Sequence, residues 1–489
     1  MRAVRAALLR FLRLLRSLFG GGEEPSVGLV EIPLDDSIAA LDEIEHVVVL
    51  MLENRSFDHM LGFLSLEGGD PDVDGLRNGM ANTADGRSYP IFRLAQTALA
   101  KTQDPCHSGA CVDEQVADAN GGFAANYIRT RLDPADREPV VVMGYYDGEQ
   151  LPVYDFLARR FCVCDRWFCS VRGATFPNRL YAVAGRAAGS RDNASPPVYH
   201  LPSFVRHLDA AGASWRWYTH EFFPTIWAID RGYLPKTFDN VRPFSSPFSF
   251  GDFFSAARTG SLPNVAWIDP NFVDVGGAVG SNDDHPPSDV RAGQELVLRV
   301  LNALVRGPGW ERTLLVVTYD EHGGFFDHVP PPSAADDDPR PEFHAYGPRV
   351  PALVVSPRLR ARVSHALFDH TSIIKTCLAR FCRSEDGRIP DMGARVGAAN
   401  HLGLLLDKEA QIARPDEASL QELASALARW RADSLRAEVA VQGEAVAPEP
   451  AVLTDFQQDY IAARETVLAS LTPEERARAA EALAASPRR

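Results

Sequence analysis

Two apolar runs, 46–52 and 313–318, each lead into a pair of polar side chains that can bind a metal ion, directly after the first run and after Tyr319 in the second. These four side chains are Glu53, Asn54, Asp320 and Glu321. If the runs are parallel strands, their carboxyl ends meet at one edge of a sheet and bring these side chains together. Neighbouring acids in a partly dry site repel each other unless a cation compensates them. The pattern predicts one divalent metal ion of unknown identity. The alternative is an acidic loop with ordinary helix caps.

A hydroxyl group suited to nucleophilic chemistry lies in the segment GATFPNR at 173–179. Pro177 favours the first turn of a helix, which puts Thr175 at the helix N-terminus. There the positive end of the helix dipole favours an anion and a hydroxyl that loses its proton. Thr175 is therefore a candidate nucleophile. The alternative is that Thr175 is a helix cap and nothing more.

Two histidines supply candidate groups for proton transfer. His107 lies in the loop sequence DPCHSG, and His285 lies in SNDDHPP, where the prolines argue against a regular element. Imidazole titrates near neutral pH, so either ring is able to donate or accept a proton. Each histidine carries little weight by itself.

The elements that position these residues read as alternating strands and helices. Near-continuous apolar runs at 46–52, 264–268, 313–318 and 350–355 are typical of strands covered on both faces, and 214–219 is a further strand. Residues 288–306 have helical periodicity, with Ser288 or Asp289 as N-cap and Gly307 as stop. We expect an α/β fold with a mostly parallel central sheet flanked by helices on both faces.

Composition excludes several classes of protein. The 489 residues include 50 Lys and Arg against 65 Asp and Glu, a formal net charge of −15, which argues against a nucleic-acid partner. The hydrophobic share of 45% and the charged share of 24% are those of a globular protein. Seven dispersed cysteines, an odd number, favour a reduced compartment over a disulfide scaffold.

The two ends of the chain differ from its body. Residues 1–22 form a basic amphipathic pattern in which arginines occupy one sector and Leu and Phe the other. We expect residues 1–19 to lie on an anionic membrane surface; the alternatives are docking on the protein's own body or a targeting peptide. A catalytic domain over 27–407 and a C-terminal helical extension over 408–489 are predicted.

Four motifs together resemble one known family. The segments ENRSFDHMLGFL, ATFPNRLY, NDDHPPSD and YDEHGGFFDHVPPP occur in the order seen in the phosphoesterase family of bacterial phosphatidylcholine-hydrolysing phospholipase C, plant non-specific phospholipase C and related bacterial acid phosphatases. The resemblance extends from about residue 45 to about residue 405. It implies an alkaline-phosphatase-like α/β fold.

The resemblance also implies roles for individual residues. The metal ligands would be Glu53, Asn54, Thr175, Asp320 and Glu321. Thr175 would be the metal-linked nucleophile, and His107 and His285 would contact the phosphoryl oxygens or the leaving group. His322 would orient a ligand, His328 would be structural, and His370 would belong to a helix-capping segment.

The function implied is that of a metal-dependent phosphoesterase. We expect a phospholipase C that forms diacylglycerol and a phosphorylated headgroup through a phosphothreonine intermediate; Glu321 favours this branch of the family. The alternative is an acid phosphatase acting on soluble phosphomonoesters. A membrane-bound scaffold without turnover is a third interpretation, which the complete ligand set opposes. We expect a cytoplasmic or membrane-peripheral location, with the secreted and periplasmic alternatives left open.

Overall fold

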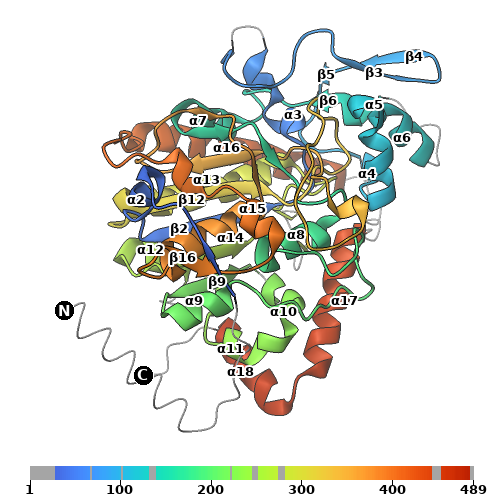
Figure 1. Cartoon of the computed structure of the whole chain (residues 1–489). Helices are drawn as coiled ribbons and strands as arrows, with labels where there is room; N and C mark the ends of the chain where they lie inside the picture. Colours follow the sequence, from blue (N-terminus) through green and yellow to red (C-terminus); the bar gives the residue numbers. More distant parts are fainter. Residues whose placement is uncertain are drawn as a thin grey trace, which may run out of the picture.

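The structure is a computed structural model of the chain (Figure 1), and it describes residues 28–66, 69–100, 103–131, 139–220, 223–244, 252–273, 281–442 and 453–484. The predicted amphipathic helix at 1–22 and the predicted start of the catalytic domain at 27 lie outside the described residues. Within those ranges, no helix is long and apolar enough to cross a membrane. The division into a catalytic domain and a helical extension stays a prediction.

A central sheet of eight strands forms the middle of the molecule. In spatial order its strands are β10 (Val241–Pro243), β9 (Trp215–Thr219), β11 (Val265–Asp269), β2 (His46–Leu52), β12 (Thr313–Tyr319), β13 (Ala352–Val355), β7 (Cys162–Cys164) and β14 (Val363–Ser364). The first five strands pair in parallel, as does β14 with β7. The predicted α/β fold with a mostly parallel sheet is therefore confirmed.

Strand β13 runs against the direction of its neighbours. It pairs antiparallel with both β12 and β7. The apolar run at 350–355 correctly marks a buried strand, but such a run carries no information about direction. The sheet is mixed on this side, and the candidate site depends only on the parallel strands β2 and β12.

Helices cover both faces of the sheet (Figure 1). On one face α13 (Val290–Arg306) packs with α7 (Pro152–Arg160) and α16 (Glu417–Gln442), and on the other α14 (Thr371–Cys377) packs with α8 (Thr175–Ala184) and α15 (Ala394–Ala398). The side chain of Asp289 caps α13 by accepting from the N–H of Arg291 at 3.0 Å, so of the two N-cap candidates the structure uses Asp289.

Smaller elements surround this framework. The remaining helices are α2 (Asp36–Leu41), α3 (Phe57–Met60), α4 (Gly109–Gln115), α5 (Ala117–Asn120), α6 (Phe123–Thr130), α9 (Val205–Ala211), α10 (Thr225–Ile229), α11 (Leu234–Thr237), α12 (Phe253–Thr259), α17 (Asp455–Ser470) and α18 (Pro473–Ala484). Two-stranded sheets pair β1 (Leu29–Glu31) with β16 (Arg388–Pro390), β3 (Ala81–Ala84) with β4 (Arg87–Pro90), β5 (Phe92–Arg93) with β6 (Gly144–Tyr145) and β8 (Trp167–Phe168) with β15 (Phe368–Asp369).

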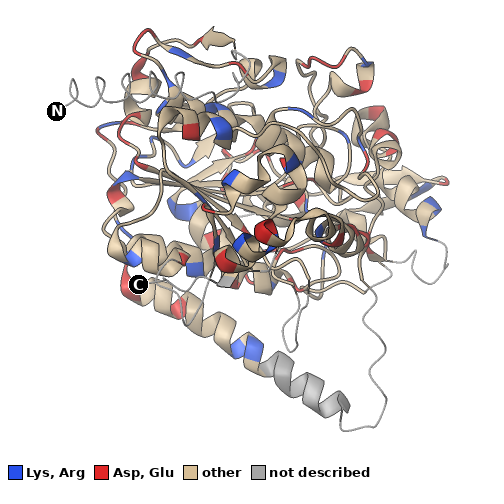
Figure 2. Cartoon of the chain, turned by 90° about the horizontal axis from the view of Figure 1, so that it is seen from below, with Lys and Arg blue, Asp and Glu red and all other residues tan. Residues whose placement is uncertain are grey.

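The core lies between the sheet and its two helical layers. All seven residues of β2 and all seven of β12 are buried, and Trp217 stacks on Trp267 with ring centroids 4.8 Å apart. Charged residues of both signs are interspersed over the described part of the molecule (Figure 2). Exposed pairs such as Arg159 with Asp155 at 2.7 Å contribute at most about 1 kcal/mol each. The apolar core therefore carries most of the stability.

Candidate active site

The register of β2 against β12 places the predicted ligands side by side. Leu52 pairs with Tyr319 at the ends of these strands, so Glu53 and Asp320 follow at the same edge of the sheet. The backbone N–H of Asn54 donates to Oδ1 of Asp320 at 3.0 Å. Asn54 has a φ of 57°, in the left-handed region, which asparagine tolerates better than most residues. This turn directs the polar side chains that follow both strands into one buried place.

The hydroxyl of Thr175 points at this cluster. Its Oγ1 lies 3.2 Å from Oε2 of Glu53 and 3.3 Å from Oδ1 of Asn54, and the residue is fully buried. The N-cap of α8 is Ala174, and no side chain caps the helix from that position. Thr175 is the first helical residue and directs its hydroxyl at the acidic cluster. The interpretation of Thr175 as a helix cap is therefore wrong.

Both candidate histidines face the same amide group. Nδ2 of Asn54 lies 3.1 Å from Nε2 of His285 and 3.4 Å from Nε2 of His107. Nδ1 of His285 lies 2.6 Å from the carbonyl of Pro286, and Nδ1 of His107 lies 3.0 Å from that of Pro105. Because a carbonyl only accepts, each Nδ1 carries a proton, and each imidazole in its neutral form presents a lone pair at Nε2 to Asn54. One amide therefore joins the hydroxyl of Thr175 to two imidazoles.

The pKa values of the two imidazoles are shifted in opposite directions. Burial lowers the pKa of His107, but the carboxylates of Glu321 and Asp104 outweigh burial and raise it above the ordinary value. Burial lowers the pKa of His285, and the nearby Asp104 only partly opposes this effect. The site therefore makes His107 the more basic and His285 the less basic of the two imidazoles. Such a pair can divide acid and base roles between its members.

The donor set fits a hard divalent cation. Oδ2 of Asp320 and Oε1 of Glu321 are buried carboxylate oxygens without a hydrogen-bond partner. Burial raises the pKa of Glu53 well above its ordinary value; Arg179 opposes this increase and Asp320 adds to it. Unpaired buried carboxylates are costly, and a cation relieves that cost. Among the described residues, no three His, Cys, Asp or Glu side chains form a ready metal-binding group. The expected acids Glu53, Asp320 and Glu321 are therefore not arranged as a ready three-carboxylate site.

Arg179 belongs to the site and was absent from the sequence-based candidates. Its Nε donates to Oε1 of Glu53 at 2.9 Å and lies 3.5 Å from Oδ2 of Asp320. It is fully buried, one helical turn beyond Thr175 on α8. The i, i+4 spacing within ATFPNR was the available signal, since it places both side chains on one face of a helix. Arg179 supplies fixed positive charge next to the carboxylates.

Three further histidines act on neighbouring groups. Nε2 of His370 donates to the backbone carbonyl of Asp320 at 2.5 Å, while the indole N–H of Trp167 donates to its Nδ1 at 3.3 Å. His370 is the N-cap residue of α14, so the expectation that it belongs to a helix-capping segment with Asp369 and Thr371 is confirmed; its ring also contacts the loop that carries Asp320. Nε2 of His322 lies 2.8 Å from Oε1 of Gln115, and His322 directly follows Glu321, a predicted metal ligand. His328 pairs with Asp58 at 2.7 Å, in a separate buried ion-pair network.

A disulfide closes the loop that carries His107. Cys106 and Cys111 are bonded, and the other five cysteines are free. This pair departs from the expectation that the cysteines are reduced. Gln115 donates to the carbonyl of Cys106 at 2.7 Å and to Oδ1 of Asn126 at 3.0 Å. The loop is therefore held to α4 by a covalent bond and a hydrogen bond.

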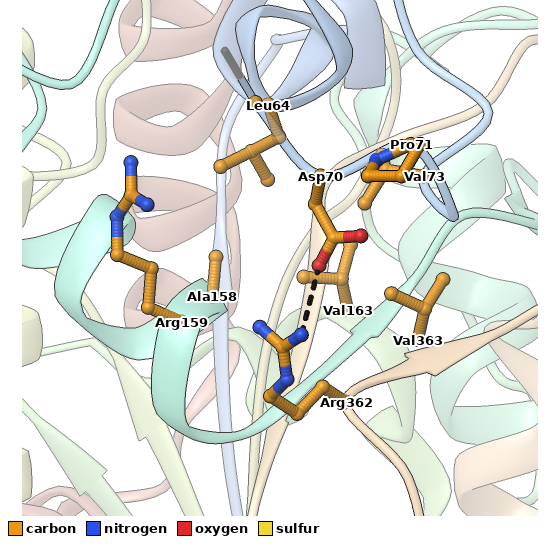
Figure 3. A pocket seen from close by; sticks show the side chains of 10 residues that line it. Leu64, Asp70, Pro71, Val73, Ala158, Arg159, Val163, Arg362 and Val363 are labelled. Carbon is orange, nitrogen blue, oxygen red and sulfur yellow. Dashed lines mark ion pairs between the residues drawn. The ribbon is translucent and has the colours of Figure 1, made fainter.

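A cavity of about 250 Å³ lies elsewhere in the molecule (Figure 3). Leu64, Val73, Ala158 and Val163 line it, and Arg362 pairs with Asp70 at 3.3 Å across it. None of the seven predicted site residues contributes to its walls. The charges of Arg362 and Asp70 in its lining neutralise each other. The cluster of polar side chains that follows β2 and β12 is therefore the better candidate for chemistry.

Comparison with known proteins identifies the family of the chain and several relatives. A family model described as the Phosphoesterase family matches residues 44–382. Phospholipase C B of Mycobacterium tuberculosis is 32% identical over 396 residues, covering 70% of this chain and 74% of that protein. Non-specific phospholipase C3 of Arabidopsis thaliana is 33% identical over 371 residues, covering 68% of each chain.

Solved structures resemble the chain more distantly. An alkaline phosphatase superfamily protein from Vibrio parahaemolyticus has a TM-score of 0.34 and 11% identity, covering 59% of this chain and 81% of its own. The lipoteichoic acid synthase LtaP from Listeria monocytogenes has a TM-score of 0.35 and 9% identity, covering 84% and 96%. Neither likeness is close enough to carry an argument about the site.

The buried hydroxyl, the carboxylate cluster and the α/β framework define a hydrolase that acts on phosphoester bonds. The chain belongs to the Phosphoesterase family, with the match covering every predicted site residue from Glu53 to Glu321.

Proposed function

We propose that the protein is a phospholipase C that hydrolyses a phospholipid to diacylglycerol and a phosphorylated headgroup. One observation carries the proposal: the amide of Asn54 joins a buried threonine hydroxyl to two imidazoles beside a carboxylate cluster. The relatives called phospholipase C support the choice of substrate class. For phosphatidylcholine the products would be diacylglycerol and phosphocholine.

Five side chains would hold one divalent metal ion. They are Glu53, Asn54, Thr175, Asp320 and Glu321. When bound, the ion supplies positive charge that lowers the pKa of the hydroxyl and neutralises the phosphoryl oxygens. Arg179 orients Glu53 by donating a 2.9 Å hydrogen bond to Oε1, the carboxylate oxygen that does not contact Thr175. The N-terminus of α8 adds a positive dipole end where the phosphoryl group would lie.

The proposed reaction has two steps. Thr175 gives its hydroxyl proton to Oε2 of Glu53, 3.2 Å away, as Oγ1 attacks phosphorus; the bond from phosphorus to the glycerol oxygen breaks, and the departing oxygen takes a proton from Nε2 of His107. Water then attacks the phosphothreonine and gives a proton to Nε2 of His107, while the proton on Glu53 returns to Oγ1 of Thr175 as the phosphorylated headgroup is released. General acid–base catalysis of this kind contributes about 10²- to 10⁴-fold. His285 stays neutral, accepts a hydrogen bond from Asn54 and lines the place of the phosphoryl group.

A comparison of two chromogenic substrates tests the proposal. The protein, supplied in turn with single divalent metals, is assayed on p-nitrophenylphosphorylcholine and on p-nitrophenyl phosphate. We expect metal-dependent turnover with preference for the diester, and release of diacylglycerol from phospholipid. Preference for the monoester, without diacylglycerol release, would instead indicate a phosphatase acting on soluble substrates.

We further propose that residues 1–19 attach the enzyme to an anionic membrane surface. The support is the division of arginines and large apolar residues between two sectors of a helix. On this proposal the protein works at the membrane periphery, where its substrate lies.

A further inference from the structure

Helix α17, near the end of the chain, contacts the candidate active site. It begins at Asp455, well beyond residues 44–382 that match the family, and it runs beside α10 and α8 (Figure 1). Its Phe456 is 1% exposed. The Phe456 ring stacks on the imidazole of His285, with ring centroids 6.1 Å apart and planes inclined by 17°. A segment remote in sequence therefore lies beside a candidate site histidine.

The same helix also contacts the start of the nucleophile helix. Phe456 packs against Phe176, the neighbour of Thr175, at 5.9 Å between ring centroids. The side chain of Asn193 donates to Asp459 of α17 at 2.8 Å and accepts from the backbone N–H of Phe176 at 3.0 Å. Asn193 therefore ties α17 to the first turn of α8. The position of α17 and the position of Thr175 are coupled through these contacts.

A third set of contacts leads to the carboxylates. Gln457 donates to the carbonyl of Phe272 at 2.9 Å, and the Phe456 ring meets that of Phe272 at 5.2 Å. The Phe272 ring in turn lies 5.1 Å from the guanidinium carbon of Arg179, the residue that holds Glu53. Three routes from the first turn of α17 therefore end on groups of the active site.

His285 needs such support because its hydrogen bonds lie in the plane of its ring. Nδ1 is held by the carbonyl of Pro286 and Nε2 by the amide of Asn54. Neither contact stops the ring from tilting out of its plane. Phe456 packs beside the imidazole with its ring nearly parallel to it, at 6.1 Å between centroids, and restricts the space into which the imidazole can tilt. If the ring tilts, Asn54 loses an acceptor and its oxygen shifts relative to Thr175.

We propose that Phe456 is a positioning residue that acts through His285, so that the C-terminal helix α17 completes the active site. This inference rests on the proposed function in its use of His285. We expect loss of Phe456 to lower kcat, because it displaces His285, which lines the proposed position of the phosphoryl group. KM should change little, because the lipid tails bind elsewhere.

A double-mutant cycle on the full-length protein tests the inference. Phe456→Leu keeps an apolar side chain and removes the stacked ring; Phe456→Ala also leaves a cavity and can lower stability. We expect Phe456→Leu to lower kcat about tenfold with KM nearly unchanged. In the His285→Ala background, the same change should cost less than about twofold, since the residue it acts through is gone. Equal costs in both backgrounds would overturn the inference.

A matched control separates positioning from stability. Val467 is fully buried on the same helix and is not among the ring contacts of Phe456. Val467→Ala should lower the thermal midpoint of unfolding without changing kcat below that midpoint. If Val467→Ala loses kcat in the same proportion to its loss of thermal stability as Phe456→Leu does, Phe456 contributes to packing alone. If His285→Ala itself retains full activity, the proposed role of His285 fails, which is a separate outcome.

A spectroscopic measurement does not depend on turnover. In protein with ¹³Cε1-labelled histidine, the His285 resonance, assigned by its absence in His285→Ala, carries a ring-current shift from Phe456. We expect Phe456→Leu to move and broaden this resonance while the resonance of the exposed His200 stays in place. An unmoved His285 resonance would contradict the inference even if the protein proved inactive on every phosphodiester.

Discussion

The side-chain nitrogen of Asn54 lies 3.1 Å from Nε2 of His285, although 231 positions of sequence separate the two residues. The oxygen of the same amide lies 3.3 Å from the hydroxyl of Thr175. An amide donates on one side and accepts on the other, so Asn54 fixes the relative orientation of an imidazole and a hydroxyl. Aspartate could not do this, since an ionised carboxylate only accepts.

Thr175→Ala should lower kcat at least about 10³-fold on a soluble phosphodiester while the fold remains intact. The hydroxyl does not cap α8, so its removal should change the free energy of unfolding by less than about 1 kcal/mol. Steady-state kinetics and thermal unfolding measure the two effects. Thr175→Ser, which keeps a hydroxyl, is the control and should retain much of the activity. An active alanine variant would remove Thr175 from the mechanism.

Asp320→Asn and Glu53→Gln should each lower the metal content of the purified protein. Both carboxylates are fully buried at one point, and loss of one negative charge weakens binding of a divalent cation there. Elemental analysis after dialysis measures the metal per chain. Asp386→Asn, an exposed acid away from the site, is the matched control. If both site variants keep their full metal content, these two carboxylates bind Arg179 and no metal ion.

Activity should fall as pH rises through the pKa of His107. The carboxylates of Glu321 and Asp104 raise this pKa above the ordinary value of about 6.5. The protonated form that donates to the leaving group therefore persists to higher pH than an isolated histidine would allow, and is lost above it. The pH profile of kcat/KM measures this alkaline limb. The activity that remains in His107→Gln should show no alkaline limb, whereas His200→Gln should leave the limb unchanged. An alkaline limb that persists in His107→Gln would belong to another group.

Reduction of the Cys106–Cys111 disulfide should lower kcat by about tenfold or less. The bond closes the loop that carries His107, and a released loop places the imidazole at the amide of Asn54 for a smaller fraction of time. Assays with and without a reductant measure the effect. The double variant Cys106→Ser, Cys111→Ser should match the reduced protein and show no response to reductant. A response in that variant would point to the five free thiols instead.

Deletion of residues 1–22 should abolish binding to anionic vesicles and reduce activity on lipid bilayers. Each arginine near anionic lipid contributes about 1 kcal/mol, so binding should also weaken as salt rises. Co-sedimentation with vesicles measures the binding. Activity on a short-chain soluble analogue should survive, because the predicted catalytic residues begin at Glu53. Equal loss on both substrates would show that the segment stabilises the catalytic body.

Local patterns were enough to predict the parts of the site that follow the two central strands. The runs at 46–52 and 313–318 are apolar throughout because both faces of these strands are covered. Their ends could therefore be located to within one residue, and parallel pairing brings Glu53 and Asp320 together. The motif order was sufficient to place the chain in its family, which the match over residues 44–382 confirms.

Only the tertiary structure shows the direction of a buried strand and the contacts between residues far apart in sequence. A buried apolar run has no direction, so the antiparallel pairing of β13 appears only when the chain is folded. The contact of His370 with the carbonyl of Asp320 depends on two loops from different strands. Likewise, nothing near residue 456 marks it as a neighbour of His285. Sequence by itself located the ends of the buried strands β2 and β12, because those ends depend on local burial and sterics. The packing of segments distant in sequence decided which residues contact each other.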